Sequence, residues 1–159
     1  MKISKTIEPI ISGISASIVI GVLAFLTLRT SAGILLMFSF GATVFLVFVL
    51  HELETAQPKN IFFGHLLTSF VGVIFVSFIQ LPLFIILPLA VGFGVGLMIL
   101  FNVPHPPAGG NPIIVILGSV SFDYLLNPIM VGSIIIIVFG IILNKFILKK
   151  KYPKNNLFA

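Results

Sequence analysis

Five long apolar stretches constrain the fold of this chain more than any other feature. They cover residues 9–28, 33–50, 61–79, 82–103 and 128–148, and each is near the roughly 20 residues that a helix needs to cross a bilayer. A sixth, residues 112–122, is about half that length. Only 8% of the 159 residues are charged, whereas soluble domains have about 25%. The sequence therefore predicts an all-helical integral membrane protein, a compact bundle of about four to six transmembrane segments.

The charges indicate how this bundle is oriented. The net charge is +5, and five of the nine basic residues are Lys145, Lys149, Lys150, Lys151 and Lys154. Basic residues that flank a last span usually mark the cytoplasmic side, which fits this cluster better than nucleic-acid binding does. Together with Lys2 and Lys5, they predict that both termini of a multi-pass cell-membrane protein are cytoplasmic. The number of crossings is then even: six, or four with two segments that enter and leave on the same side.

The run of residues 103–117 interrupts helix where an interruption is costly. It reads Val-Pro-His-Pro-Pro-Ala-Gly-Gly-Asn-Pro-Ile-Ile-Val-Ile-Leu. A proline has no N–H, and it pushes the preceding residue toward extended geometry, so regular helix cannot continue through this run. Irregular backbone at membrane depth is tolerated only where it is buried in protein or lines a wet cavity. The run therefore marks a candidate site.

An internal repeat with an offset of 68 residues gives this break a counterpart. The offset carries Gly41 onto Gly109, Ala42 onto Gly110, Thr43 onto Asn111, Gly64 onto Gly132 and Gly72 onto Gly140. We interpret the chain as one transmembrane domain, 1–159, with repeats at about 9–80 and 82–148 and a basic tail at 149–159. Each repeat has three segments, of which the middle one is interrupted. The halves are inverted if each crosses three times, and parallel if the middle segment re-enters.

The breaks predict the chemistry of a possible ligand. A helix that starts near Asn111 or Pro112 presents free backbone N–H groups and the positive end of its dipole, which suit an anion. The matching break at residues 41–43 would aim a second helix start at the same region. Corresponding interrupted segments are the best pointer in a sequence to the binding site of a transporter.

Histidine is the other candidate for chemistry. His105 can donate a hydrogen bond when neutral and supply charge when protonated near physiological pH, which would couple anion movement to protons. The alternative is a structural histidine that bonds carbonyl groups freed by the prolines. His65 has the same two interpretations because an ionisable group within a span is a functional candidate. His51, beside Glu52, is expected at the water interface.

Other classes of function have little support in the sequence. There are no cysteines, and the histidines and glutamates lack the spacing of metal ligands. No arrangement of nucleophile and base is suggested, and no Walker motif is present. We therefore expect no enzyme activity, no metal and no cofactor. Any transport would be passive, coupled to an ion or driven by a separate partner.

The segment 105–109 reads His-Pro-Pro-Ala-Gly, and with it the chain resembles the HPP family of small integral membrane proteins. The segments 39–42, 56–60 and 64–65 resemble other characteristic segments of that family, in the same order. Some members transport nitrite in cyanobacterial and chloroplast membranes, so the resemblance implies nitrite as a substrate. Family members often have Gly-Ala-Thr after the signature, whereas this chain has Gly-Gly-Asn-Pro at 109–112.

The leading hypothesis is a transporter or channel for a small inorganic anion. Its expected partners are membrane lipids, the anion and a second copy of the chain. One alternative is a membrane scaffold or subunit that transports nothing alone, and another is a permeation path for a neutral small molecule. A polar cavity between Gly41 and Asn111 favours transport, and a dry seam favours a structural role. The candidate substrate-binding residues are Gly41, Ala42, Thr43, Gln57, Asn60, His65, His105, Pro106, Pro107, Gly109, Gly110 and Asn111.

Overall fold

The computed structural model describes residue 4, residues 6–31 and residues 33–154. All regular structure in these ranges is helical, which confirms the predicted fold class. Four helices are long and apolar enough to cross a membrane: α1 (Glu8–Arg29), α3 (Pro58–Phe78), α4 (Leu83–Leu100) and the last helix, Leu125–Ile147. The last helix consists of η3 (Leu125–Met130), which contains a kink at Asn127, followed by α6 (Val131–Ile142) and η4 (Leu143–Ile147).

The second segment of the first half is shorter than predicted. Residues 33–50 are predicted to form a long segment interrupted at residues 41–43, but only α2 (Phe38–Phe48) is helical, and residues 33–37 lie outside any helix. Thr27 explains this, because its hydroxyl accepts the backbone N–H groups of Leu35 and Leu36 and so satisfies an extended chain. The predicted break at residues 41–43 is also wrong. These residues lie inside α2, which has already begun at Phe38.

The second segment of the other half is broken where the prolines predicted it. After α4, residues 103–105 are extended, a short helix η2 (Pro106–Gly110) follows, and α5 (Asn111–Leu117) continues from it. The helical turns therefore begin at Pro106, five residues before the predicted start of the half helix. Another short helix, η1 (Glu54–Ala56), lies in the connection between α2 and α3, residues 49–57, which we call the polar loop.

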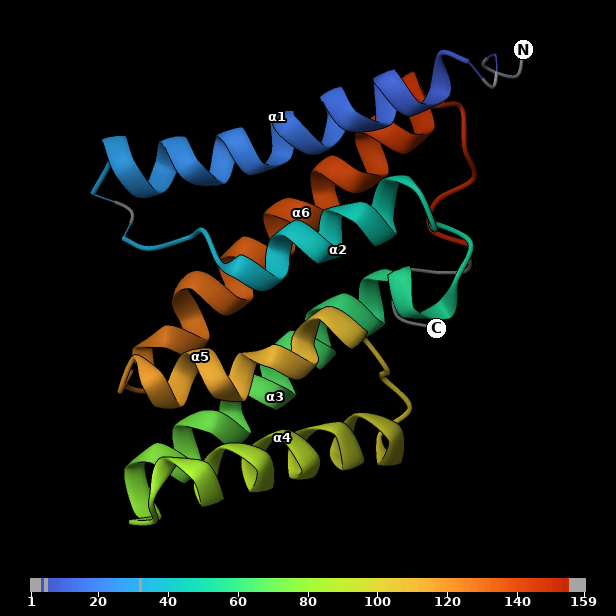
Figure 1. The fold of residues 1–159 in the computed structure, drawn as a ribbon. Coiled ribbons are helices and arrows are strands. Elements are labelled where there is room, and N and C mark those ends of the chain that lie inside the picture. The colour runs from blue at the N-terminus through green and yellow to red at the C-terminus, as the bar shows by residue number, and fades with distance from the viewer. Residues whose placement is uncertain (1–3, 5, 32, 155–159) are drawn as a thin grey trace.

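The helices pack as two groups, and in each group two helices of one half pack with the third helix of the other half. In Figure 1, α1, α2 and α6 lie side by side in one group, and α3, α4 and α5 form the other. The larger apolar core joins the first group around Val19, Phe40 and Ile136, while a smaller core joins the second group around Val71 and Ala90. A helix from each half thus packs mainly with the other half. The two groups meet where α2 contacts η2 and where α3 contacts the last helix at α6 and η3, and this seam positions the site.

Two close glycine contacts follow the 68-residue offset. A Cβ on Gly72 would lie 2.8 Å from the Cβ of Val115, and a Cβ on Gly140 would lie 2.7 Å from Cγ1 of Val47. Adding 68 converts Gly72 to Gly140 and Val47 to Val115, so each half supplies a glycine that receives a valine of the other. The packing has the symmetry expected of a duplication, which itself stays a prediction.

The interrupted segments run across the bundle and do not turn back. Figure 1 shows α2 running from the end of the bundle where α1 stops toward the end where α1 starts, and α5 running in the opposite direction. Each half therefore passes across the bundle three times. The first half begins at one end of the bundle and the second half at the other, which is the inverted arrangement.

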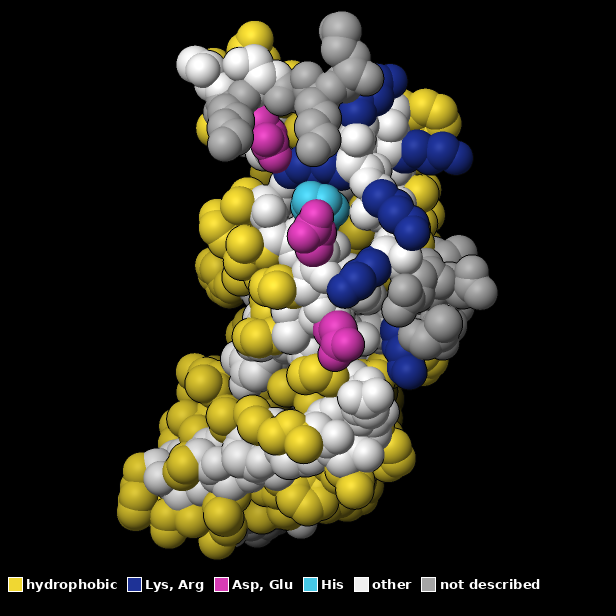
Figure 2. Space-filling model, turned by 90° about the vertical axis from the view of Figure 1, so that its right-hand side faces the viewer, with side chains coloured by type: hydrophobic (Ala, Val, Ile, Leu, Met, Phe, Trp, Pro, Cys, Tyr) yellow, Lys and Arg dark blue, Asp and Glu magenta, His cyan; other side chains and the backbone are white. Residues whose placement is uncertain are grey.

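Charged side chains gather at the end of the bundle where α1 begins. Figure 2 views this end and shows basic and acidic side chains together on it; the chain's single arginine, Arg29, lies at the other end of α1, so the basic side chains here are lysines. Lys150 in the tail forms an ion pair of 2.8 Å with Glu8, and the backbone N–H of Lys154 donates to the side chain of Gln57 in the polar loop. The start of α1, the loop and the tail thus share one end. That this end faces the cytoplasm stays a prediction.

Candidate functional site

Four buried polar side chains meet where the two broken segments approach each other. They are Thr43 of α2, His65 of α3, His105 just before η2 and Asn111 of α5, and each is 0% exposed. The Thr43 Oγ1 atom lies 2.9 Å from Nε2 of His65 and 3.0 Å from Nε2 of His105. Asn111 Nδ2 lies 3.0 Å from Nδ1 of His65. We call these four side chains the polar cluster.

The prolines put His105 into the polar cluster. Because a proline follows it, His105 adopts extended backbone geometry, with φ −141° and ψ 93°. The side chain of Asn60 donates to the Pro104 carbonyl at 3.0 Å, and the His105 Nδ1–H donates to the Thr55 carbonyl at 2.7 Å. The extended segment is therefore held by partners on α3 and in the polar loop. Those bonds replace the helical bonds that the prolines prevent.

Gly64 allows α3 to approach this segment closely. A Cβ at this position would lie 2.7 Å from the Cβ of His105 and 3.3 Å from the Val103 carbonyl oxygen. Small residues at such contacts let membrane segments pack at short range. Gly64 therefore lets the segment around His105 lie close to α3, and the next residue, His65, contacts His105.

His65 has a partner on each ring nitrogen. Thr43 lies against Nε2 and Asn111 against Nδ1, so the two residues that the 68-residue offset relates contact opposite sides of the same imidazole. The ring also packs edge-on against Phe40, with centroids 5.1 Å apart, and lies 4.8 Å from the ring of His105. His65 is seven residues into α3, about 10 Å from its start, which places the cluster well inside the bundle.

Asn111 extends the polar cluster toward the middle of α3. Its Nδ2 donates to Ser69 Oγ at 3.0 Å and lies 3.3 Å from the His65 carbonyl oxygen. Its Oδ1 is buried and has no hydrogen-bond partner in the described structure. Sequence reasoning missed Ser69 and the Thr55 carbonyl. The spacing of four residues between His65 and Ser69, which places both on one helix face, was the available signal for Ser69.

The other predicted site residues lie outside the polar cluster. Gln57 bonds the backbone carbonyls of His51 and Leu53 in the polar loop and so faces away from the imidazoles. Asn60 supports the cluster through Pro104 but does not belong to it. Exposed or half-buried positions are taken by Gly41, Ala42, Pro106, Pro107, Gly109 and Gly110.

The predicted anion site at the start of α5 is wrong in its physical basis. The helical turns begin with Pro106 and Pro107, which have no N–H groups to offer. The N–H of Ala108 bonds the His105 carbonyl, and the N–H of Asn111 bonds the Ala108 carbonyl. Because α5 continues from η2, its first turn is not an open helix end. Any charge attraction at this site must come from the imidazoles.

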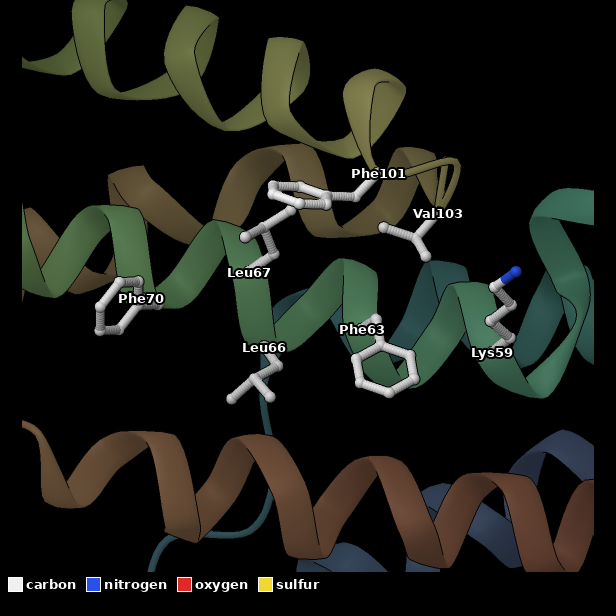
Figure 3. Close-up of a pocket in the computed structure, with 7 residues that line it drawn as sticks. All are labelled: Lys59, Phe63, Leu66, Leu67, Phe70, Phe101 and Val103. Carbon is white, nitrogen blue, oxygen red and sulfur yellow. The ribbon is translucent and has the colours of Figure 1, made fainter. Parts of the chain in front are cut away.

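Two cavities described in the structure lie away from the polar cluster. An apolar groove of about 560 Å³ lies along α3 and the end of α4, and Figure 3 shows the side chains that line it. A second cavity of about 700 Å³ lies between α1 and α2, with Gly41 in its wall and Glu8 and Lys150 at its edge. Neither is lined by a member of the cluster. The residues that line the groove in Figure 3 are Lys59, Phe63, Leu66, Leu67, Phe70, Phe101 and Val103.

The sequence around this geometry matches a known family. The model of the HPP transmembrane region matches residues 2–153, nearly the whole chain. The chain belongs to the HPP family. It is 30% identical to one transmembrane protein of Dictyostelium discoideum over 72% of the chain and 43% of that protein. A second transmembrane protein of the same organism is 31% identical over 89% of the chain and 49% of its own length.

The HPP transmembrane region is thus a membrane-embedded helical unit in this chain, as the resemblance implied. The chain spans less than half the length of each Dictyostelium relative. No solved structure matches the chain. The histidine of the His-Pro-Pro signature is His105, which lies in the polar cluster, whereas the two prolines that follow it shape the backbone.

Proposed function

We propose that this HPP protein is a transporter or channel for a small inorganic anion, with nitrite as the first candidate because of the family resemblance. The observation that carries the proposal is a pair of buried imidazoles with no buried acid in the chain. The four acidic residues, Glu8, Glu52, Glu54 and Asp123, are all exposed or half-exposed. A proton on either imidazole would therefore leave a buried positive charge that an anion can neutralise.

The position of the polar cluster supports this interpretation. Ionisable groups inside a membrane bundle are costly, and they commonly mark the path of an ion or proton. The cluster joins the two interrupted segments of inverted halves, which is where transporters built from such halves bind their substrates. Because the four side chains are fully buried, anion passage requires the two helix groups to separate at the seam.

The same burial favours a second candidate, a membrane scaffold or subunit that transports nothing by itself. The polar cluster bonds mainly to itself, and a buried hydrogen-bond network can serve to fix one packing arrangement. The two candidates differ in what the cluster does when an anion gradient is applied. A scaffold has no need for an imidazole that changes its charge.

Reconstituted protein tests the proposal. We expect purified full-length chain in liposomes to move nitrite faster than empty liposomes do, and His105→Ala to reduce that flux strongly. His51→Ala is the matched control, because His51 lies in the polar loop and bonds Gln57 through its backbone carbonyl, which the change leaves in place. Near-ultraviolet circular dichroism would show that both variants are folded.

The outcome separates the candidates. Flux equal to that of empty liposomes, for nitrite and for a panel of small anions, would refute the transport proposal and favour the scaffold. Flux of neutral solutes alone would favour a path for neutral molecules. The proposal involves no bond making, so the chain acts as a carrier or channel and not as an enzyme. We further propose membrane lipids and a second copy of the chain as partners.

A further inference from the structure

The hydrogen-bond partners determine where the protons of the two imidazoles lie. A backbone carbonyl can only accept, so His105 donates from Nδ1 to the Thr55 carbonyl. Asn111 Nδ2 also faces the carbonyl of His65, which fixes that end of the amide as the donor. His65 Nδ1 therefore accepts from Asn111, and the proton of neutral His65 lies on Nε2.

Thr43 connects the two rings through a single hydroxyl. His65 Nε2–H donates to Thr43 Oγ1, and the hydroxyl hydrogen is then free to donate to Nε2 of neutral His105. With both rings neutral, each group donates to the next: Asn111 to His65, His65 to Thr43, Thr43 to His105, and His105 to the Thr55 carbonyl. In this arrangement each ring nitrogen and the Thr43 hydroxyl have a complementary partner.

The same atoms can accept one more proton without losing a partner. If a proton binds His105 Nε2, an N–H bond forms, the cluster gains one positive charge, and His105 becomes a donor to Thr43 Oγ1. The hydroxyl of Thr43 then turns to the Ser39 carbonyl, which lies 3.1 Å away. Both lone pairs of Oγ1 are then used by the two imidazoles. The Thr43 hydroxyl is thus a switch with two satisfied positions.

His65 has no equivalent arrangement. A proton added to His65 Nδ1 would face Asn111 Nδ2, so two donors would lie 3.0 Å apart. Relief would require the amide to rotate, which would break its bond to Ser69 and place Oδ1 against the carbonyl oxygen of His65. The added proton therefore belongs on His105, and the 4.8 Å between the ring centroids disfavours a second charge on His65.

We propose that His105 carries one proton with each anion and that Thr43 switches its hydroxyl as this proton binds and leaves, so that the chain is an electroneutral proton–anion cotransporter. This inference rests on the proposed anion transport. The protonated His105 and the anion would neutralise each other at the cluster, which avoids moving a net charge through the low-dielectric bundle.

The surroundings of the polar cluster leave this role to His105. The segments α2, η2, α4, α5 and α6 carry no charged residue. Among the other elements packed at the site, η1 carries Glu54, which is exposed, and α3 carries Lys59, which lines the groove of Figure 3. The titratable group that each imidazole faces is therefore the other imidazole.

Coupling is tested in liposomes that contain a pH-sensitive dye and are given a nitrite gradient. We expect one proton to enter with each nitrite, and we expect a potassium diffusion potential set with valinomycin to leave the rate unchanged. Thr43→Val keeps the shape but removes the hydroxyl, and should lower proton-driven nitrite uptake by about tenfold or more, because a hydrogen bond to a charged group is lost. Thr43→Ser is the matched control and should retain coupled uptake.

The outcomes keep this inference separate from the transport proposal. Nitrite flux that depends on voltage and brings in no proton would overturn the inference and leave anion transport standing. An unchanged rate in Thr43→Val would also overturn it. If no anion moves at all, the transport proposal fails as well.

Proton location can be tested in the full chain without any flux. In nanodiscs, ¹⁵N spectra of labelled histidine rings should show Nε2 of His105 gaining a proton as the pH falls, while His65 keeps one tautomer. Signals can be assigned by their loss in His105→Gln and His51→Gln. Titration of His65 before His105 would contradict the assignment.

Discussion

Gly64→Ala should show how tightly the His-Pro-Pro segment is held against α3. The added Cβ would lie 2.7 Å from the Cβ of His105, and ordinary contact begins at 3.4 Å, so the two segments must separate by about 0.7 Å. The Val103 carbonyl oxygen, 3.3 Å away, restricts movement in that direction. Overpacking of this kind costs about 1–3 kcal/mol, which exceeds the helix-propensity gain of up to about 1 kcal/mol from replacing glycine.

The matched control is Gly92→Ala in the middle of α4. Nothing lies within 4 Å of a Cβ added there, so this substitution should leave stability unchanged or raise it slightly. Equilibrium unfolding of both variants in mixed detergent and SDS gives the comparison. Equal stability of the two variants would refute the claim that α3 and the His105 segment are in rigid contact. A shift of 0.7 Å taken up at the 3.0 Å bond between His105 and Thr43 would also break the polar cluster, so nitrite flux should fall with stability.

Two further predictions concern the charged end of the bundle. Tyr152→Phe removes the hydroxyl that donates to the Ala56 carbonyl at 2.8 Å. Because Tyr152 is buried and the carbonyl loses its partner, the free energy of unfolding should fall by about 1 kcal/mol in the same assay. No change would mean that the tail does not pack against the polar loop. Partial burial, and next the charge of Lys150, lower the pKa of His51. The folded state therefore favours neutral His51, and this contribution to stability should be present above the ordinary pKa near 6.5 and lost as the pH falls through the lowered value. His51→Gln should remove this part of the pH dependence of stability, and an unchanged pH profile would contradict the prediction.

The sequence was most informative where a physical constraint acts on few residues. Apolar length predicted the long helices, and the prolines predicted the break before α5, because a missing N–H ends a helix whatever the tertiary contacts are. The 68-residue offset brought Thr43 and Asn111 to attention together. In the structure both contact the imidazole of His65, at opposite ring nitrogens.

The break in the first half could not be located from the sequence. No proline marks residues 33–37, and the N–H groups of Leu35 and Leu36 are satisfied by Thr27 of α1, which is a tertiary contact. The start of α2 at Phe38 therefore has no local signal as strong as a proline. The 68-residue offset placed a break at residues 41–43 because they match the small residues at 109–111, but a glycine inside a helix costs only about 1 kcal/mol and does not end it.

The predicted anion site was wrong because the backbone N–H donors that it required are not free. The sequence argument counted free N–H groups at Asn111, whereas Pro106 and Pro107 had already begun the helical turns without supplying any. Composition also cannot show which polar groups become neighbours. Ser69 lies at the site only because α5 packs on that face of α3. Gln57 lies outside it because its side-chain amide donates to the His51 carbonyl in the polar loop.

The polar cluster divides unevenly between the two helix groups, and this division bears on how the site could open. His65, His105 and Asn111 belong to the group of α3, α4 and α5, and Thr43 alone comes from the group of α1, α2 and α6. Its bonds of 2.9 and 3.0 Å to the two imidazoles are therefore the cluster's hydrogen bonds across the seam. Separation of the groups would release Thr43 first and leave both Nε2 atoms facing the opening. A proton or an anion entering there would meet the imidazole that the hydroxyl had just released, so the residue proposed as the switch is also the residue that closes the seam.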